Sequence, residues 1–181
     1  MNLDRIILTS HKNIERAGTR NPYIIAREIG VEVRFKDLGN QMGMYKYYDK
    51  NNRYITINQY LCHCVQILTC HHEIWHDIND QDIAKNRVLQ DIRINLNDPI
   101  ELRANMYAAE TQFDDNDILE FVKYGYTTEQ IAMETGTYTD YVKIKLEMLR
   151  YKGYEIKENE FNPYFMRVAE GKRYRSDYFP C

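Results

Sequence analysis

The chain has 181 residues and a formal net charge of −3, and 44% of its residues are hydrophobic and 13% aromatic. This length and apolar content suffice for one compact domain and exclude a chain that is disordered throughout. The nearly balanced charge excludes the large positive excess typical of proteins dedicated to nucleic acids or anionic membranes. No apolar run approaches the roughly 18 residues of a membrane span, and the N-terminal residues lack the apolar core of a secretory signal. We therefore expect a cytoplasmic protein that does not bind membranes.

Apolar periodicity and turn residues predict the elements in chain order. Helices are expected over 2–17, 21–30, 59–78 and 99–112, followed by shorter helical segments to about residue 152. Between the second and third helices, the pattern predicts a strand over 31–35 and a hairpin over 43–58 around the turn sequence "DKNN". Because the strands come early and the helices late, the fold class is α+β.

The chain is assigned one domain over residues 1–153, followed by an aromatic-rich tail over 154–181. Within that domain, residues 127–153 have the spacing of a helix-turn-helix, with Gly136 in the turn. A DNA-binding interpretation would place residues 139–150 in a major groove. This segment carries four basic and four acidic residues, so it lacks the positive excess that neutralises phosphates. We favour a role in packing or in contact with a protein substrate.

The sequence "CHHEIWH" places His72, Glu73 and His76 in the order H-E-x-x-H. An apolar stripe at helical spacing runs through Leu61, Cys64, Val65 and Leu68 and continues to His72, Trp75 and His76. Two histidines one turn apart on an inward face, with Cβ atoms about 5–6 Å apart, can converge on one Zn²⁺. Glu73 lies only about 60° around the helix from His76, and would act on a bound water as general base. The alternative interpretation is a pair of helical histidines with no metal.

A third ligand is required, because catalytic zinc sites usually have three protein ligands and a water. Glu101 begins the next long helix, and the small residues Ala104 and Ala108 would let that helix approach the histidines closely. Asn105, one turn after Glu101, is placed to hold a ligand by a hydrogen bond. Glu101 has a second interpretation as a charge that complements the helix dipole. Four aspartates compete for the ligand role: Asp77, Asp80, Asp82 and Asp91.

The cysteine-rich stretch around the motif is a second candidate metal site, with Cys62, His63, Cys64, Cys70 and His71 as its members. On one continuous helix these side chains point in divergent directions, and Cys62 and Cys64 fall on roughly opposite sides. We therefore favour reduced thiols over a disulfide or a structural zinc site.

The sequence "ILTCHHEIWH" followed by "IELRANMYAAE" resembles the ImmA/IrrE family of metallo-endopeptidases, over about residues 20–150. The resemblance implies a zincin-like fold, with His72, His76 and Glu101 as zinc ligands and Glu73 as the base. It also implies that the protein cleaves a helix-turn-helix transcriptional repressor encoded beside it, in a phage or mobile element. A strand over 53–58 or its hairpin partner would bind an extended peptide at a sheet edge. The alternative function is a non-catalytic regulator that binds DNA or protein and retains the peptidase fold.

Overall fold

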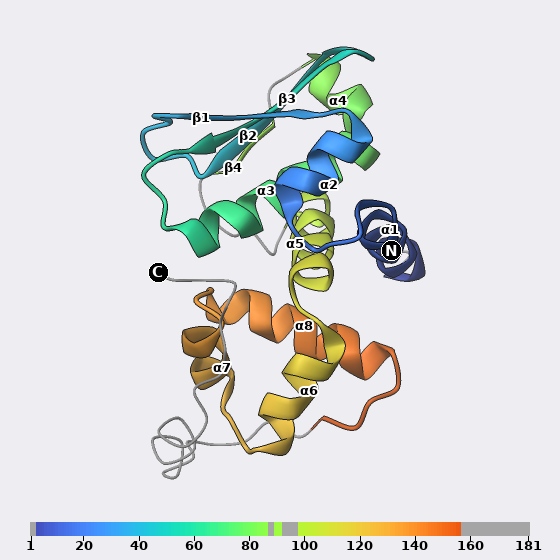
Figure 1. The fold of residues 1–181 in the computed structure, drawn as a ribbon, viewed down its shortest axis with the longest axis vertical. Coiled ribbons are helices and arrows are strands. Elements are labelled where there is room, and N and C mark those ends of the chain that lie inside the picture. Colours follow the sequence, from blue (N-terminus) through green and yellow to red (C-terminus); the bar gives the residue numbers. More distant parts are fainter. Residues whose placement is uncertain (1–2, 87–88, 92–97, 157–181) are drawn as a thin grey trace. The chain divides into compact units, whose positions relative to one another are not determined.

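The computed structural model describes residues 3–86, 89–91 and 98–156, and the chain divides into two compact units, Met1–Gln112 and Phe113–Cys181 (Figure 1). The first unit contains the sheet and five helices, and the second contains three further helices among the residues described. The fold is therefore α+β, with an early sheet and a helical C-terminal half, as predicted. From residue 157 onward, the tail predicted over 154–181 lies outside the described residues.

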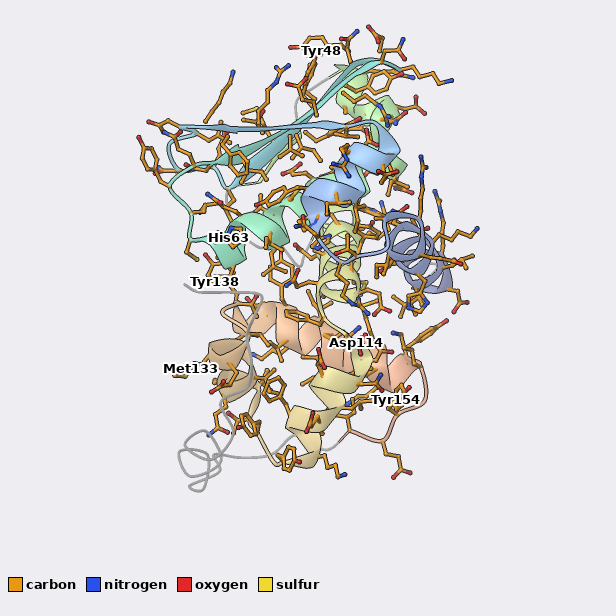
Figure 2. All side chains as sticks on the ribbon, viewed as in Figure 1. Tyr48, His63, Asp114, Met133, Tyr138 and Tyr154 are labelled. Carbon is orange, nitrogen blue, oxygen red and sulfur yellow. The ribbon has the colours of Figure 1, made fainter. Side chains whose placement is uncertain are left out.

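The sheet of the first unit has four strands in the order β1-β3-β2-β4. They are β1 (Glu32–Lys36), β2 (Gly43–Asp49), β3 (Asn52–Asn58) and β4 (Leu89–Asp91). The predicted hairpin is confirmed, since β2 and β3 are antiparallel and joined by a tight turn. Figure 2 shows Tyr48 at the exposed hairpin end of the sheet. Strand β4 was not predicted, because three residues are too few to show an alternating pattern.

The expectation that β3 offers a sheet edge is wrong, and β4 covers its hairpin partner β2 over Gly43–Tyr45. Strand β3 pairs with β1 in parallel on one side and with β2 on the other. Strand β2 in turn pairs with β4 over its first three residues. The two outer strands are therefore β1 and β4, and the pairings that enclose the hairpin join segments far apart in the sequence.

The helices of the first unit follow the predicted order, with one addition. They are α1 (Leu3–Ala17), α2 (Pro22–Ile29), α3 (His63–Asn79), α4 (Gln81–Asn86) and α5 (Pro99–Gln112). The side chain of Asn21 accepts a hydrogen bond from the backbone N–H of Tyr23 and caps α2. Gly30 ends α2 in the left-handed conformation, at φ 79°. The added helix, α4, is only six residues long.

Helix α3 lies between the sheet and α5 (Figure 1), and its residues are buried on almost every side. Every residue from Cys64 to Asp77 is buried except Gln66. The sequence predicted that α3 is buried along a single stripe. The buried surface is wider than predicted, because the helix has neighbours on opposite faces. Its predicted start at residue 59 is also too early: residues 59–61 form a turn, and Cys62 has an extended backbone and precedes the first helical residue.

Asp77, near the end of α3, ties that helix to the sheet through a buried ion pair. Its carboxylate lies 2.7 Å from Nη1 of Arg53 on β3 and accepts a hydrogen bond of 2.7 Å from the hydroxyl of Tyr45 on β2. Arg53 also donates to the backbone carbonyls of Ile29 and Gly30, at the end of α2. Burial raises the pKa of Asp77, although Tyr45 and Arg53 oppose this rise by stabilising the carboxylate. One carboxylate thus joins three elements.

The second unit contains α6 (Asp115–Lys123), α7 (Thr128–Glu134) and α8 (Thr139–Tyr151). Helices α7 and α8 occupy the segment predicted as helix, turn and helix, and Gly136 between them has φ 62°. Thr127 and Gln130 form a capping box at the start of α7. The ammonium of the fully buried Lys145 lies 2.6 Å from the carboxylate of Asp115. In the part of the chain that is described, no helix has the length and apolar character needed to span a membrane.

We expect Arg53→Met to lower the free energy of unfolding by about 3 kcal/mol, because it leaves a buried carboxylate without its cation. The measurement is urea denaturation followed by circular dichroism. Arg34→Met is the matched control, since the ion pair of Arg34 with Glu32 is solvent-exposed and should contribute little. Equal losses in the two variants would contradict the assignment of the Arg53–Asp77 ion pair as the contact that joins these elements.

Candidate metal centre

Three potential ligand atoms converge in the first unit, from two histidines and one glutamate. The Nε2 atom of His72 lies 3.0 Å from Nε2 of His76 and 3.1 Å from Oε2 of Glu101. The distance from Nε2 of His76 to the same carboxylate oxygen is 3.7 Å. Ligand atoms at about 2.0–2.1 Å from one tetrahedral zinc are separated by about 3.3–3.4 Å. The three observed separations bracket this value, so the donor set fits one metal ion.

Helices α3 and α5 bring these residues together. His72 and His76 are one turn apart on α3, and their ring centroids are separated by 4.8 Å. Ala104 and Ala108 of α5 are fully buried, and α5 packs along α3 as the small residues predicted. The rings of Trp75 on α3 and Tyr107 on α5 are also in contact, at 5.4 Å between centroids.

The other ring nitrogen of each histidine also has a hydrogen-bonding partner. Nδ1 of His72 lies 2.9 Å from Oδ1 of Asn105, and Nδ1 of His76 lies 2.8 Å from Oδ2 of Asp80. Both oxygens accept a hydrogen bond from Nδ1–H, and the Nε2 atoms face the carboxylate of Glu101. This arrangement directs both imidazoles toward one point.

The charges of the site stabilise one another. Burial by itself would raise the pKa of Glu101, but hydrogen bonds from His72 and His76 outweigh it and bring the pKa below the ordinary range. Burial disfavours the charged form of His76, and contacts with Asp80 and Glu101 overcome this and raise its pKa. Glu101 is therefore a carboxylate at neutral pH, which is the form that binds a cation.

Three of the four aspartates that competed for the ligand role have other partners. Asp77 faces Arg53 and Tyr45, Asp80 lies on the Nδ1 side of His76, and Asp82 is exposed and pairs with Lys85. Asp91 is in β4, where its backbone is in register with Gly43. Sequence reasoning considered Asp80 only as a ligand. Its i+4 spacing from His76 was the signal that would have identified it as a helical side-chain partner.

Glu73 is buried on the side of α3 that faces β2. A Cβ atom added to Gly43, the first residue of β2, would lie 2.7 Å from Oε1 of Glu73 and 2.5 Å from Cγ2 of Thr69. Real Cβ atoms essentially never make contacts this short, so the glycine allows the strand backbone to approach the carboxylate. The sequence predicted Glu73 beside the histidines but did not indicate Gly43.

Among the described residues, the second candidate site around the cysteines does not form a metal cluster. The group of three potential ligands in this part of the chain is His72, His76 and Glu101. The expectation that Cys62 and Cys64 lie on opposite sides is wrong: their sulfurs are 3.2 Å apart, because Cys62 precedes the helix. His63 is the first residue of α3 and lies at its exposed N-terminal end (Figure 2). His71 is fully buried, and burial lowers its pKa to about 3.

Comparison with known proteins agrees with this geometry. Residues 26–153 match the model of the IrrE N-terminal-like domain. The chain is also 30% identical over 137 residues to the uncharacterized immunity region protein 2 of Bacillus phage phi105, an alignment that covers 73% of this chain and 83% of the relative. No solved structure matches the chain. The resemblance to the ImmA/IrrE family is thus confirmed, and the chain belongs to the Peptidase_M78 family, which is defined by the IrrE N-terminal-like domain.

Proposed function

We propose that the protein is a zinc-dependent endopeptidase that cleaves a protein substrate, and that this substrate is a helix-turn-helix repressor of a phage or mobile element. The observation that carries the proposal is the convergence of His72, His76 and Glu101, with Glu73 on the same helix. A cluster of two imidazoles and one carboxylate is a ligand set used by catalytic zinc sites in peptidases.

Each residue of the site has a distinct role in this proposal. His72, His76 and Glu101 hold the ion, and Asn105 holds the ring of His72 in its binding orientation. A zinc ion bound there supplies a Lewis acid that polarises the scissile carbonyl and lowers the pKa of water. Glu73 accepts the proton of the attacking water and then delivers it to the leaving amine, which completes peptide hydrolysis with no covalent bond between enzyme and substrate.

The regulatory setting is supported by the phage relative, whose name refers to an immunity region. A transcriptional repressor acts in the cytoplasm of the bacterial host, so an enzyme that cleaves it must be in the cytoplasm as well. The family match reaches residue 153, which supports our view that the catalytic domain extends over 1–153 and includes the helix-turn-helix-like segment 127–153.

The second candidate is a non-catalytic regulator that keeps this fold. Its DNA-binding form is disfavoured by α8, the helix that would enter a major groove. Between Tyr141 and Leu149, only Lys143 and Glu147 are exposed, and their charges are opposite. Base recognition in a groove needs several exposed side chains on one helix face. The protein-binding form is separated from the peptidase by the tests that follow.

A chelator should lower the melting temperature of the wild type, because zinc that binds only the folded state stabilises it by mass action, by about 2.7 kcal/mol at 100 times the Kd. The double variant His72→Ala, His76→Ala should show no such shift. Differential scanning fluorimetry with and without chelator measures both. A shift of the same size in the double variant would place the metal elsewhere.

Glu101→Ala should weaken zinc binding more than alanine at Asp77, Asp82 or Asp91, because Glu101 supplies an atom to the converging set. Competition with a fluorescent zinc indicator measures the Kd of each purified variant. A larger loss for one of the three aspartates would show that the third ligand has been chosen wrongly.

Glu73→Gln should keep zinc affinity and folding but lose cleavage by several orders of magnitude, because the amide cannot accept the proton of water while the charge of the base is also removed. Each variant is co-expressed with the repressor encoded beside it, under inducing conditions such as DNA damage. A discrete fragment is sought, and the cut is identified by mass spectrometry.

Cleavage by Glu73→Gln at a rate near that of the wild type would contradict the role of this residue as base. If the zinc-loaded wild type cleaves none of the candidate repressors under inducing conditions, the result favours a non-catalytic, protein-binding regulator over a peptidase. Glu129→Gln serves as the matched control, since this residue lies in the first turn of α7, and it should cleave like the wild type.

A further inference from the structure

We propose that Asp80 is a positioning residue that orients His76 and strengthens its bond to the metal. This inference rests on the zinc site proposed above and adds a residue to it. Asp80 follows the last residue of α3, and it is 3% exposed. Its carboxylate contacts the ring of His76 on the side away from the converging atoms.

The backbone fixes Asp80 at the junction of two helices. Its N–H donates to the carbonyl of His76, and its own carbonyl accepts from Ile83 and Ala84 in the first turn of α4. These hydrogen bonds use only main-chain atoms, so any residue could make them. The carboxylate is therefore available for a separate task.

Both carboxylate oxygens of Asp80 are engaged. Oδ2 lies 2.8 Å from Nδ1 of His76, and Oδ1 accepts a hydrogen bond of 2.8 Å from the side chain of Asn79. The carboxylate is consequently held between a neighbouring amide and the imidazole. A side chain fixed at both ends orients its partner more firmly than one that is free to rotate.

The chemistry of this contact favours metal binding at Nε2. A carboxylate that accepts the Nδ1 proton fixes the tautomer whose lone pair is on Nε2, and its negative charge makes that nitrogen a stronger ligand. Asn105 makes the corresponding contact to His72 with a neutral amide oxygen. The two histidines thus have partners of different charge, and the anionic partner should have the larger effect on affinity.

The same geometry separates Asp80 from the ligands. The imidazole of His76 lies between the carboxylate of Asp80 and the atoms that converge on the metal, since Asp80 contacts Nδ1 while Nε2 faces His72 and Glu101. Asp80 therefore acts through His76.

The test compares zinc affinity across a matched set of variants. Asp80→Ala should raise the zinc Kd by about 10–100-fold, and Asp80→Asn should recover part of the loss because its amide oxygen still accepts a hydrogen bond from Nδ1–H. Asn105→Ala should raise the Kd less than Asp80→Ala, and His76→Ala should abolish binding. Melting temperatures measured in chelator report any purely structural effect of each change.

Nuclear magnetic resonance of ¹⁵N-histidine-labelled protein gives a readout that does not depend on zinc. In the wild type, with or without zinc, Nδ1 of His76 should carry a proton in a strong hydrogen bond. Asp80→Ala should lose that signature. If the wild type shows it but does not bind zinc, the proposed function fails while the contact is confirmed.

Two outcomes would overturn the inference. Wild-type zinc affinity in Asp80→Ala, together with a lower melting temperature in chelator, would make Asp80 a structural residue only. Loss of zinc as complete as in His76→Ala, with Asp80→Asn no better, would make it a ligand.

Discussion

The enclosure of α3 between the sheet and α5 is the constraint on which the site depends. A polar group buried in an apolar interior destabilises the fold unless it is hydrogen-bonded. Helix α3 carries several such groups, and their partners come from different elements: Arg53 from β3 for Asp77, Asn105 from α5 for His72, and Asp80 from the end of the helix itself for His76. Because each contact has a short, directed geometry, α3 cannot rotate without breaking several of them together. The orientation of the ligands thus follows from satisfying the buried polar groups.

Local patterns in the sequence were sufficient to predict the hairpin over 43–58. They were also sufficient to predict α5, whose predicted range of 99–112 matches the observed one. These elements have signals that extend over many residues. The parallel pairing of β1 with β3 and the addition of β4 could not be predicted, since they depend on contacts between distant segments. Burial of α3 on opposite faces follows from the same contacts. A stripe of apolar residues describes one face of a helix, and it does not show a second neighbour.

At the site, helical spacing was sufficient to bring His72 and His76 together, because two residues four apart are neighbours on any helix. Choosing among the carboxylates required the backbone. Asp77 and Asp80 are both close to His76 in the sequence, and neither is in the ligand set. Asp80 caps the C-terminal end of α3, and Asp77 faces the sheet. Cys62 and Cys64 show the same limit: their sulfurs meet because the helix begins at residue 63, which no periodic pattern revealed.

Glu73 and His72 are adjacent in the sequence but are supported by different elements. Successive helical residues are about 100° apart around the axis, so His72 faces Glu101 and Asn105 of α5 while Glu73 faces the first residue of β2. The carboxylate of Glu73 fits there because position 43 has no side chain. The ligand set therefore depends on how α3 packs against α5, and the space for the base depends on how closely β2 approaches α3. Since these are separate interfaces, metal binding and proton transfer are physically separable properties of this fold, and a substitution at one interface can alter one property while sparing the other.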